Sequence, residues 1–385
     1  MKKYFTVAAS FILMLCLGGV YAWSIIASEL IEKYHFSSTQ TQVIFGTLIA
    51  VFPITMIFVG KIASRLSVRF LGYLSGFLFL GGYLLAGLSG GDFYLILLGV
   101  GILSGVATGF GYWVSISVPV QWFPERKGLV TGIAAAGFGL GALLLSQASE
   151  VILLSGKNVS QLLNIIAISY GLIIIIVSNL IRQKKHDGKV NRIKLSDFLF
   201  SKACNKLFFG IFLGTFAGLL VIGSLKLIGE QYQITNHSLL VGVSLFAVAN
   251  FLGRLFWGWL SDYLNPRFTI FFALLLQSIG IFLLDLVRLS DFLFIMLSFF
   301  IGLGFGSNFV LFAKETAQRF GLMNLGKIYP YIFLGYALAG IAGPLIGGIL
   351  FDRTGTYTSS VIIAGFVSLS GGFVYLVNPV KKRKI

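Results

Sequence analysis

The feature that most constrains this chain is the recurrence of long apolar segments along its whole length. A segment of about 17 to 25 apolar residues can cross roughly 30 Å of hydrocarbon as a helix. Of the 385 residues, 57% are hydrophobic and only 11% are charged, whereas an ordinary soluble domain is about one quarter charged. Spanning segments must be helices or a closed barrel, because the bilayer interior offers no water to backbone groups. Runs this long are not barrel strands, so the sequence predicts an all-α, polytopic membrane protein.

Twelve such segments can be counted, and one long polar stretch divides them into two sets of six. The first set lies at residues 6–28, 42–61, 69–89, 93–118, 127–150 and 161–181. The second set lies at residues 206–227, 239–260, 267–287, 292–313, 327–350 and 357–378. We therefore expect an N-terminal six-helix bundle (1–181), a linker (182–205) and a C-terminal six-helix bundle with a basic tail (206–385).

The basic residues are unevenly distributed between the two sides of this topology. The net charge is +16, and the basic residues of the linker and of the tail at 381–384 fall on the same side as most others. The opposite side carries only Lys33, Lys157, Lys226, Arg288 and Arg353. By the positive-inside rule, both termini and the linker are expected in the cytoplasm, with the helices in the plasma or inner membrane. The charge is explained by topology, so we expect a lipid bilayer and no nucleic acid as partner.

A ten-residue motif occurs once in each half of the chain. The sequence GKIASRLSVR (60–69) follows the second predicted helix, and GWLSDYLNPR (258–267) follows the eighth. The predicted fifth and eleventh helices are both rich in glycine, which lets helix backbones approach closely. Matching features in equivalent helices predict two pseudo-symmetric halves, as in transporters that alternate access.

These motifs resemble those of the major facilitator superfamily, and the resemblance extends over essentially the whole chain. The motif at 258–267 is similar to the loop signature that this superfamily carries between helices 2 and 3 and repeats between helices 8 and 9. The resemblance implies a cytoplasmic latch formed by Asp262 and Arg267. In the first copy Arg65 and Arg69 are retained, but the acidic position is a serine. Ordinary basic loops are the alternative to a latch.

Arg254 places a permanent charge inside the apolar segment 239–260. An arginine in hydrocarbon costs at least a few kcal/mol. Its side chain could extend to the cytoplasmic interface, about six residues or roughly 9 Å away, or it could face a central cavity. Asn250 lies one turn away on the same face of the helix. Because a guanidinium matches a carboxylate with two parallel hydrogen bonds, the sequence favours an anion site at Arg254 and Asn250.

A narrower resemblance is to the oxalate:formate antiporter family and the related monocarboxylate transporters. It rests on GVYAWSI (19–25), QWFPERKGLVTGIAAAGFGLGALL (121–144) and NFLGRLFWGWLSD (250–262). The resemblance implies secondary active transport of a small organic anion, with the helix 8 arginine, here Arg254, binding the substrate carboxylate. Monocarboxylate transporters of the human type have an aspartate where this chain has Asn250.

Five further residues are candidates for the lining of the same cavity, and simple helix packing is the alternative for each. In the first helix Tyr21 and Trp23 point in different directions, so at most one of them faces the cavity. Tyr21 is preferred because it shares a face with Leu17 and Ser24. The set is Tyr21, Tyr112, Asn308, Tyr331 and Tyr336. Lys226 and Lys314, near helix ends, are expected to be interfacial.

A single buried cation favours a substrate with a single carboxylate. The resemblance to oxalate exchangers implies a second cation in helix 11, but residues 329–350 contain no lysine or arginine. We therefore predict a small monocarboxylate such as lactate or formate, carried by proton symport or anion exchange. Oxalate:formate-type exchange is the first alternative, and a sensor that binds its ligand without moving it is the second.

Motifs of catalysis are missing from the sequence. There is no nucleotide-binding loop, no Cys/His ligand cluster and no pair of carboxylates at the membrane midplane. The sequence therefore predicts a transporter and not an enzyme, with no cofactor and no metal, and we expect it to be a monomer.

Overall fold

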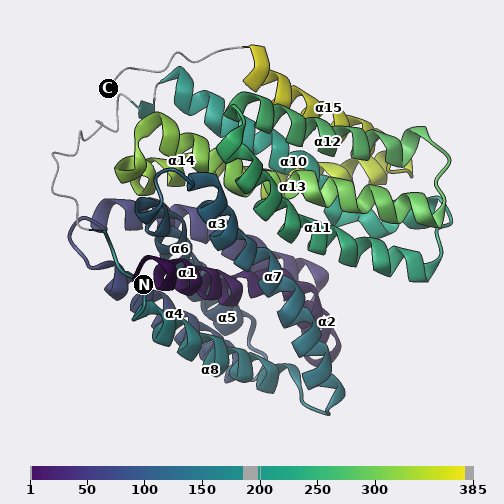
Figure 1. Cartoon of the computed structure of the whole chain (residues 1–385). Helices are drawn as coiled ribbons and strands as arrows, with labels where there is room; N and C mark the ends of the chain where they lie inside the picture. The colour runs from purple at the N-terminus through teal and green to yellow at the C-terminus, as the bar shows by residue number, and fades with distance from the viewer. Residues whose placement is uncertain (1, 185–197, 200, 378–385) are drawn as a thin grey trace. The chain divides into compact units, whose positions relative to one another are not determined.

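The computed structural model describes residues 2–184, 198–199 and 201–377, and these residues fold almost entirely into helices (Figure 1). Twelve helices in the described part of the chain are long and apolar enough to cross a membrane. The prediction of an all-α protein with twelve membrane spans is confirmed. Most of the predicted linker (182–205) and all of the basic stretch at 381–384 lie outside the described residues.

The chain divides into two compact units. Unit 1 comprises residues 1–123 and 134–188, and unit 2 comprises residues 124–133 and 189–385. One helix, α7 (Lys127–Leu154), contributes its first two turns to unit 2 and its remainder to unit 1. The sequence symmetry alone would have assigned all of α7 to the first half of the chain.

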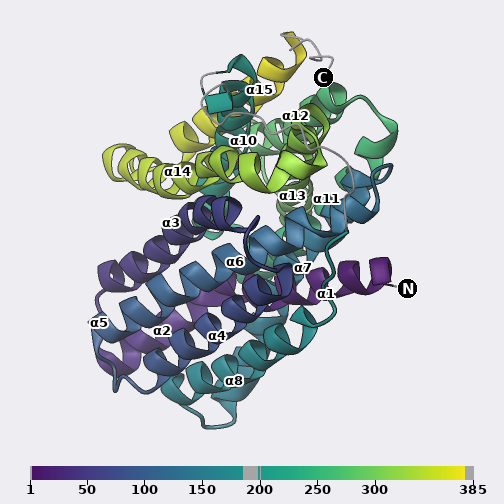
Figure 2. The same ribbon diagram turned by 90° about the vertical axis from the view of Figure 1, so that its left-hand side faces the viewer.

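Unit 1 contains the helices of the first half of the chain. They are α1 (Lys2–Gly18), the 3-10 turn η1 (Gly19–Ala22), α2 (Trp23–Tyr34), α3 (Ser38–Ile62), α4 (Val68–Gly87), α5 (Phe93–Ile96), the π-helical segment η2 (Leu97–Leu103), α6 (Ser104–Ser117), the 3-10 turn η3 (Pro119–Trp122), most of α7, and α8 (Val159–Ser178). Polar side chains start several of them: Ser37 and Asn158 form capping boxes for α3 and α8, which satisfies backbone N–H groups that have no partner inside the helix. Figures 1 and 2 both show α4 and α8 packed side by side.

The first membrane span departs from the prediction of one uninterrupted helix over residues 6–28. The 3-10 turn η1 separates α1 from α2 at Gly19–Ala22. Just before this turn α1 approaches α7 closely, because a Cβ atom at Gly18 would lie 2.0 Å from the carbonyl oxygen of Phe138. Glycine permits this approach and is also a weak helix former, so the helix changes its winding directly after this close contact.

Unit 2 contains the first turns of α7 and six long helices. These are α10 (Lys202–Gln231), α11 (Asn236–Tyr263), α12 (Pro266–Leu286), α13 (Asp291–Phe320), α14 (Leu322–Thr354) and α15 (Thr358–Val377). Among these six helices, α11 and α13 share the most extensive contact, where a Cβ atom at Gly253 would lie 2.3 Å from the carbonyl oxygen of Leu303. Small residues at such crossings allow the van der Waals contact that drives helix association in a membrane.

Candidate functional site

Arg254 lies in the second half of α11, and its side chain is enclosed by protein. The residue is 0% exposed. Its Nε atom donates a hydrogen bond to Asn250 Oδ1 at 3.2 Å, one helical turn away. The Cζ atom lies 4.2 Å from the centre of the Phe309 ring on α13, a cation–π distance. The guanidinium therefore does not extend to an exposed interface.

An aromatic group surrounds Phe309 and includes one predicted residue. The ring of Tyr336 lies 5.3 Å from that of Phe309, and it stacks on Phe333 at 5.0 Å. Tyr336 therefore contacts the same Phe309 ring that lies against Arg254. Phe309 itself was not predicted from the sequence, because nothing distinguishes it among the 38 phenylalanines of the chain.

Two other predicted residues of unit 2 have different surroundings. Asn308 is fully buried, and its Nδ2 atom donates to the carbonyl oxygen of Phe305 at 3.0 Å. Its Oδ1 atom faces Gly214 of α10, where a Cβ atom would lie only 2.1 Å away. Tyr331 is half-buried, and none of the ring contacts described here links it to Phe309. The structure brings Tyr336 close to the Arg254 group and places Asn308 at a different helix interface.

In unit 1 the structure brings the two predicted tyrosines together. Tyr21 and Tyr112 each make an edge-on contact with Phe138 of α7, both at 5.5 Å between ring centres. Phe52 of α3 completes the group at 5.5 Å from Tyr112. Trp23 instead donates from Nε1 to the carbonyl oxygen of Thr41 at 3.1 Å, so it fastens α2 to α3. The preference for Tyr21 over Trp23 as a lining residue stays a prediction.

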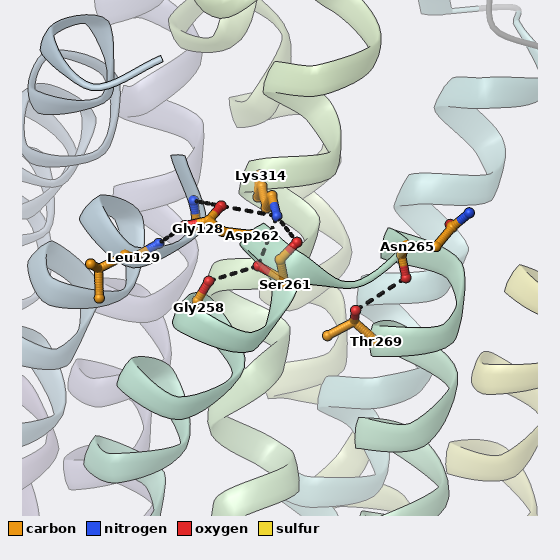
Figure 3. A network of polar contacts seen from close by, with 8 residues as sticks. All are labelled: Gly128, Leu129, Gly258, Ser261, Asp262, Asn265, Thr269 and Lys314. Atoms are coloured by element: carbon orange, nitrogen blue, oxygen red, sulfur yellow. Dashed lines mark hydrogen bonds and ion pairs between the residues drawn. The ribbon is translucent and has the colours of Figure 1, made fainter. Parts of the chain in front are cut away.

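Asp262, near the end of α11, holds the start of α7 (Figure 3). Its Oδ1 and Oδ2 atoms accept hydrogen bonds from the backbone N–H groups of Gly128 and Leu129, each at 2.9 Å. A carboxylate in this position satisfies two N–H groups of the first helical turn and opposes the positive end of the helix dipole. All of these residues belong to unit 2.

The cation that pairs with Asp262 is Lys314 of α13. Its Nζ atom lies 3.0 Å from Asp262 Oδ1, and the side chains of Lys314 and Asp262 are only 3% and 8% exposed. Lys314 also donates to the carbonyl oxygen and, at 3.1 Å, to the Oγ atom of Ser261. Lys314 is therefore buried within unit 2, and its position relative to the membrane interface stays a prediction. In the sequence, this buried charge group is indicated only by the charged residues Lys314 and Glu315, which are adjacent. In the structure Glu315 pairs with Arg319, one turn further along α13.

The basic residues expected in the latch are placed differently. The half-buried Arg267 stands at the start of α12, where its backbone N–H donates to Asn265 Oδ1 at 3.1 Å. Among the ion pairs found in the described residues, Asp262 is joined to Lys314 and not to Arg267. In the first copy of the motif, Arg65 is exposed and Arg69 is half-buried.

One side of α11 connects the two groups described above. Asn250, Arg254, Gly258 and Asp262 follow one another at four-residue intervals, so they lie on the same side of the helix. The first turns of α7 run along this side, because a Cβ atom at Gly258 would lie 2.6 Å from the carbonyl oxygen of Gly128. A buried arginine and a carboxylate that caps α7 thus share one helix face. In the described part of the chain, no group of three or more His, Cys, Asp or Glu residues could hold a metal ion.

Comparisons with named proteins agree with this architecture. The chain is 28% identical over 347 residues to the uncharacterized MFS-type transporter YhjX of Escherichia coli (strain K12), covering 88% of this chain and 86% of that protein. It is 26% identical over 378 residues to the oxalate:formate antiporter of Oxalobacter formigenes, covering 94% and 88%. Monocarboxylate transporter 12 of Mus musculus is 23% identical over 337 residues, covering 75% and 68%.

A solved structure and a family model both match nearly the whole chain. The crystal structure of FucP, a Major Facilitator Superfamily transporter in the outward conformation, matches with a TM-score of 0.71 at 16% identity, covering 95% of this chain and 97% of that one. The model of the Major Facilitator Superfamily matches residues 7–202 and 207–385. This chain belongs to the Major Facilitator Superfamily, a family of secondary transporters and not of enzymes.

Proposed function

We propose that this transporter carries a small monocarboxylate and that Arg254 is its anion anchor. The observation that supports the proposal is the full burial of Arg254 within a membrane-spanning helix, beside Asn250 and Phe309. A charged side chain at such a depth is costly and marks a substrate or ion site. Asn250 fixes the plane of the guanidinium by accepting from Nε, and a carboxylate bound in that plane accepts two parallel hydrogen bonds.

The names of two relatives support a carboxylate. One relative is an oxalate:formate antiporter and another is a monocarboxylate transporter. The preference for one carboxylate over two comes from charge, because residues 329–350 contain no second lysine or arginine. Transport proceeds by alternating access, either as proton symport or as anion exchange. The aromatic rings of Phe309 and Tyr336 would cover the apolar part of the substrate.

The second part of the proposal is a latch around Asp262. Its support is that the carboxylate binds both the start of α7 and the buried ammonium of Lys314. Lys314 takes the role of direct partner that the family resemblance implied for Arg267. Arg267, Arg65 and Arg69 then act through the positive charge they give to the loops that carry them. From the positive-inside rule we also expect this end of unit 2 and both termini in the cytoplasm, with the protein as a monomer in the plasma or inner membrane.

Uptake of labelled lactate, formate and oxalate into proteoliposomes tests the anchor. We expect Arg254→Gln to abolish uptake and Arg254→Lys to lower it strongly, because an ammonium cannot form the parallel pair of bonds. Arg288→Gln is the matched control, since Arg288 is exposed and lies between α12 and α13. Unchanged carboxylate uptake in Arg254→Gln would contradict the proposal.

The same vesicles separate the two transport modes and the alternative substrate. Symport requires that uptake follows an imposed pH gradient without any anion inside. Uptake that needs an internal anion and ignores pH means exchange. Oxalate uptake that exceeds uptake of lactate and formate would favour the oxalate:formate type and contradict the argument from a single cation.

A further inference from the structure

A pair of buried amide side chains lies where α10, α12 and α13 meet in unit 2. Gln277 of α12 and Asn308 of α13 are both 0% exposed. Both reach the backbone of α10 at Gly214: Gln277 Nε2 donates to its carbonyl oxygen at 2.9 Å, and Asn308 Oδ1 fills the place of its missing Cβ. A glycine at this position is what allows the two amides to enter the same helix junction.

The orientation of each amide is fixed by its donor group. Gln277 must present nitrogen to the carbonyl oxygen of Gly214, and Asn308 Nδ2 must face the carbonyl oxygen of Phe305 at 3.0 Å. This leaves Gln277 Oε1 and Asn308 Oδ1, which accept no hydrogen bond from the residues that the structure describes. Two acceptors cannot satisfy each other. A buried acceptor without a donor costs about 1–3 kcal/mol, and such groups in a native protein indicate a bound water or ion.

We propose that Gln277 and Asn308 hold one buried water molecule, which donates one O–H group to Gln277 Oε1 and the other to Asn308 Oδ1. Buried waters typically make about three hydrogen bonds to polar groups that have no protein partner. A hard metal cation would need roughly six oxygen ligands. The two amides supply two, and the neighbouring side chain at Gly214 is the apolar Leu274, so the junction suits water and not a cation such as sodium.

The corresponding helix contact in unit 1 is satisfied without such a ligand. There Ser75 of α4 donates directly from Oγ to the carbonyl oxygen of Ala107 of α6, at 2.7 Å. In unit 2 the longer amides leave two oxygens that need a common donor. Because Asn308 directly precedes Phe309, a junction that fixes Asn308 also fixes the rotation of α13 that places the Phe309 ring beside Arg254. This inference does not depend on the identity of the substrate.

A double-mutant cycle on the full-length protein in detergent tests the proposal. Gln277→Met and Asn308→Leu each remove one oxygen with little change of volume, and each leaves the other oxygen without its donor. We expect both single variants to lower the melting temperature, and the double variant to lower it by about 2–6 °C less than the sum. Ser278→Ala is the control, because Ser278 is buried on α12 but bonds to Gly365 at 2.8 Å. Its effect should add to that of Asn308→Leu.

Two measurements distinguish water from the alternatives. An experimental structure that resolves ordered water should show a peak within hydrogen-bond distance of both amide oxygens. The melting temperature should be the same in sodium chloride and in choline chloride of equal ionic strength. The proposal would be overturned by an experimental structure that shows no water between the two amides. It would also be overturned if the losses in melting temperature of the two single variants added strictly in the double variant, or if sodium alone raised the melting temperature.

Discussion

Removal of one partner from the ion pair between Asp262 and Lys314 is expected to cost several kcal/mol in unit 2. Both side chains are almost fully buried, at 8% and 3% exposure, and breaking a buried pair by removal of one partner typically costs about 3–5 kcal/mol. Asp262→Asn leaves the ammonium of Lys314 without its anion and replaces one acceptor for α7 by an N–H₂ group. With roughly 2–4 °C per kcal/mol for a unit of about 200 residues, a loss of about 3 kcal/mol lowers the melting temperature by roughly 6–12 °C.

Replacement of the other partner, Lys314, should lower the stability less than Asp262→Asn does. Lys314→Met leaves the carboxylate of Asp262 bonded to the N–H groups of Gly128 and Leu129. The positive end of the α7 dipole offsets up to about 2 kcal/mol in such a position. The double variant Asp262→Asn with Lys314→Met contains neither buried charge. We therefore expect it to lose less stability than the two single variants lose together, by a coupling energy of about 1.5–3 kcal/mol.

A thiol-reactive dye follows this unfolding in detergent. Both cysteines, Cys16 and Cys204, are buried, so the dye reacts only when the protein opens. In a Cys16→Ala background the signal reports Cys204 of α10, hence unit 2. If the double variant lost as much as the two single variants together, Asp262 and Lys314 would not be coupled and the argument would fail.

Two further predictions concern packing and pH. Gly258→Ala would place a Cβ atom 2.6 Å from the carbonyl oxygen of Gly128, so it should lower the folding stability by about 1–3 kcal/mol as the helices shift. Gly348→Ala is the control, because nothing lies within 4 Å of a Cβ atom there, and it should be neutral or stabilising. Equal melting temperatures for the two variants would contradict this prediction. Burial, helped by the hydrogen bond to Asp285, raises the pKa of Tyr232 above its usual 10.0. The protonated Tyr232 side chain therefore stabilises the fold fully below about pH 10, and this stabilisation is lost as the pH rises through the raised pKa. The difference in melting temperature between wild type and Tyr232→Phe should shrink above pH 10. A constant difference from pH 8 to 12 would exclude a stabilising role of the protonated Tyr232.

The sequence alone determined the membrane class, the twelve spans and which residues share one side of a helix. The length of an apolar segment decides whether it crosses the bilayer, and helical periodicity places residues four apart on one side. The placement of Asn250 one turn from Arg254 follows directly from the second of these facts, whereas the bond between them was found in the structure. The stripe that continues to Asp262 follows from the same fact, because all three residues belong to α11.

The tertiary structure decided which helices those residues meet. In a membrane helix nearly every side is apolar, so the hydrophobic pattern gives little information on rotation or on neighbours. Phe309 beside Arg254, Lys314 against Asp262, and the meeting of Gln277 and Asn308 at Gly214 all join different helices. Phe309, Lys314 and Asn308 all come from α13, and the sequence does not mark which of its sides face the neighbouring helices. The assignment of the first turns of α7 to unit 2 has the same cause. Glycines at 128 and 258 let the backbones of α7 and α11 touch, and only then can the carboxylate of Asp262 reach the start of α7.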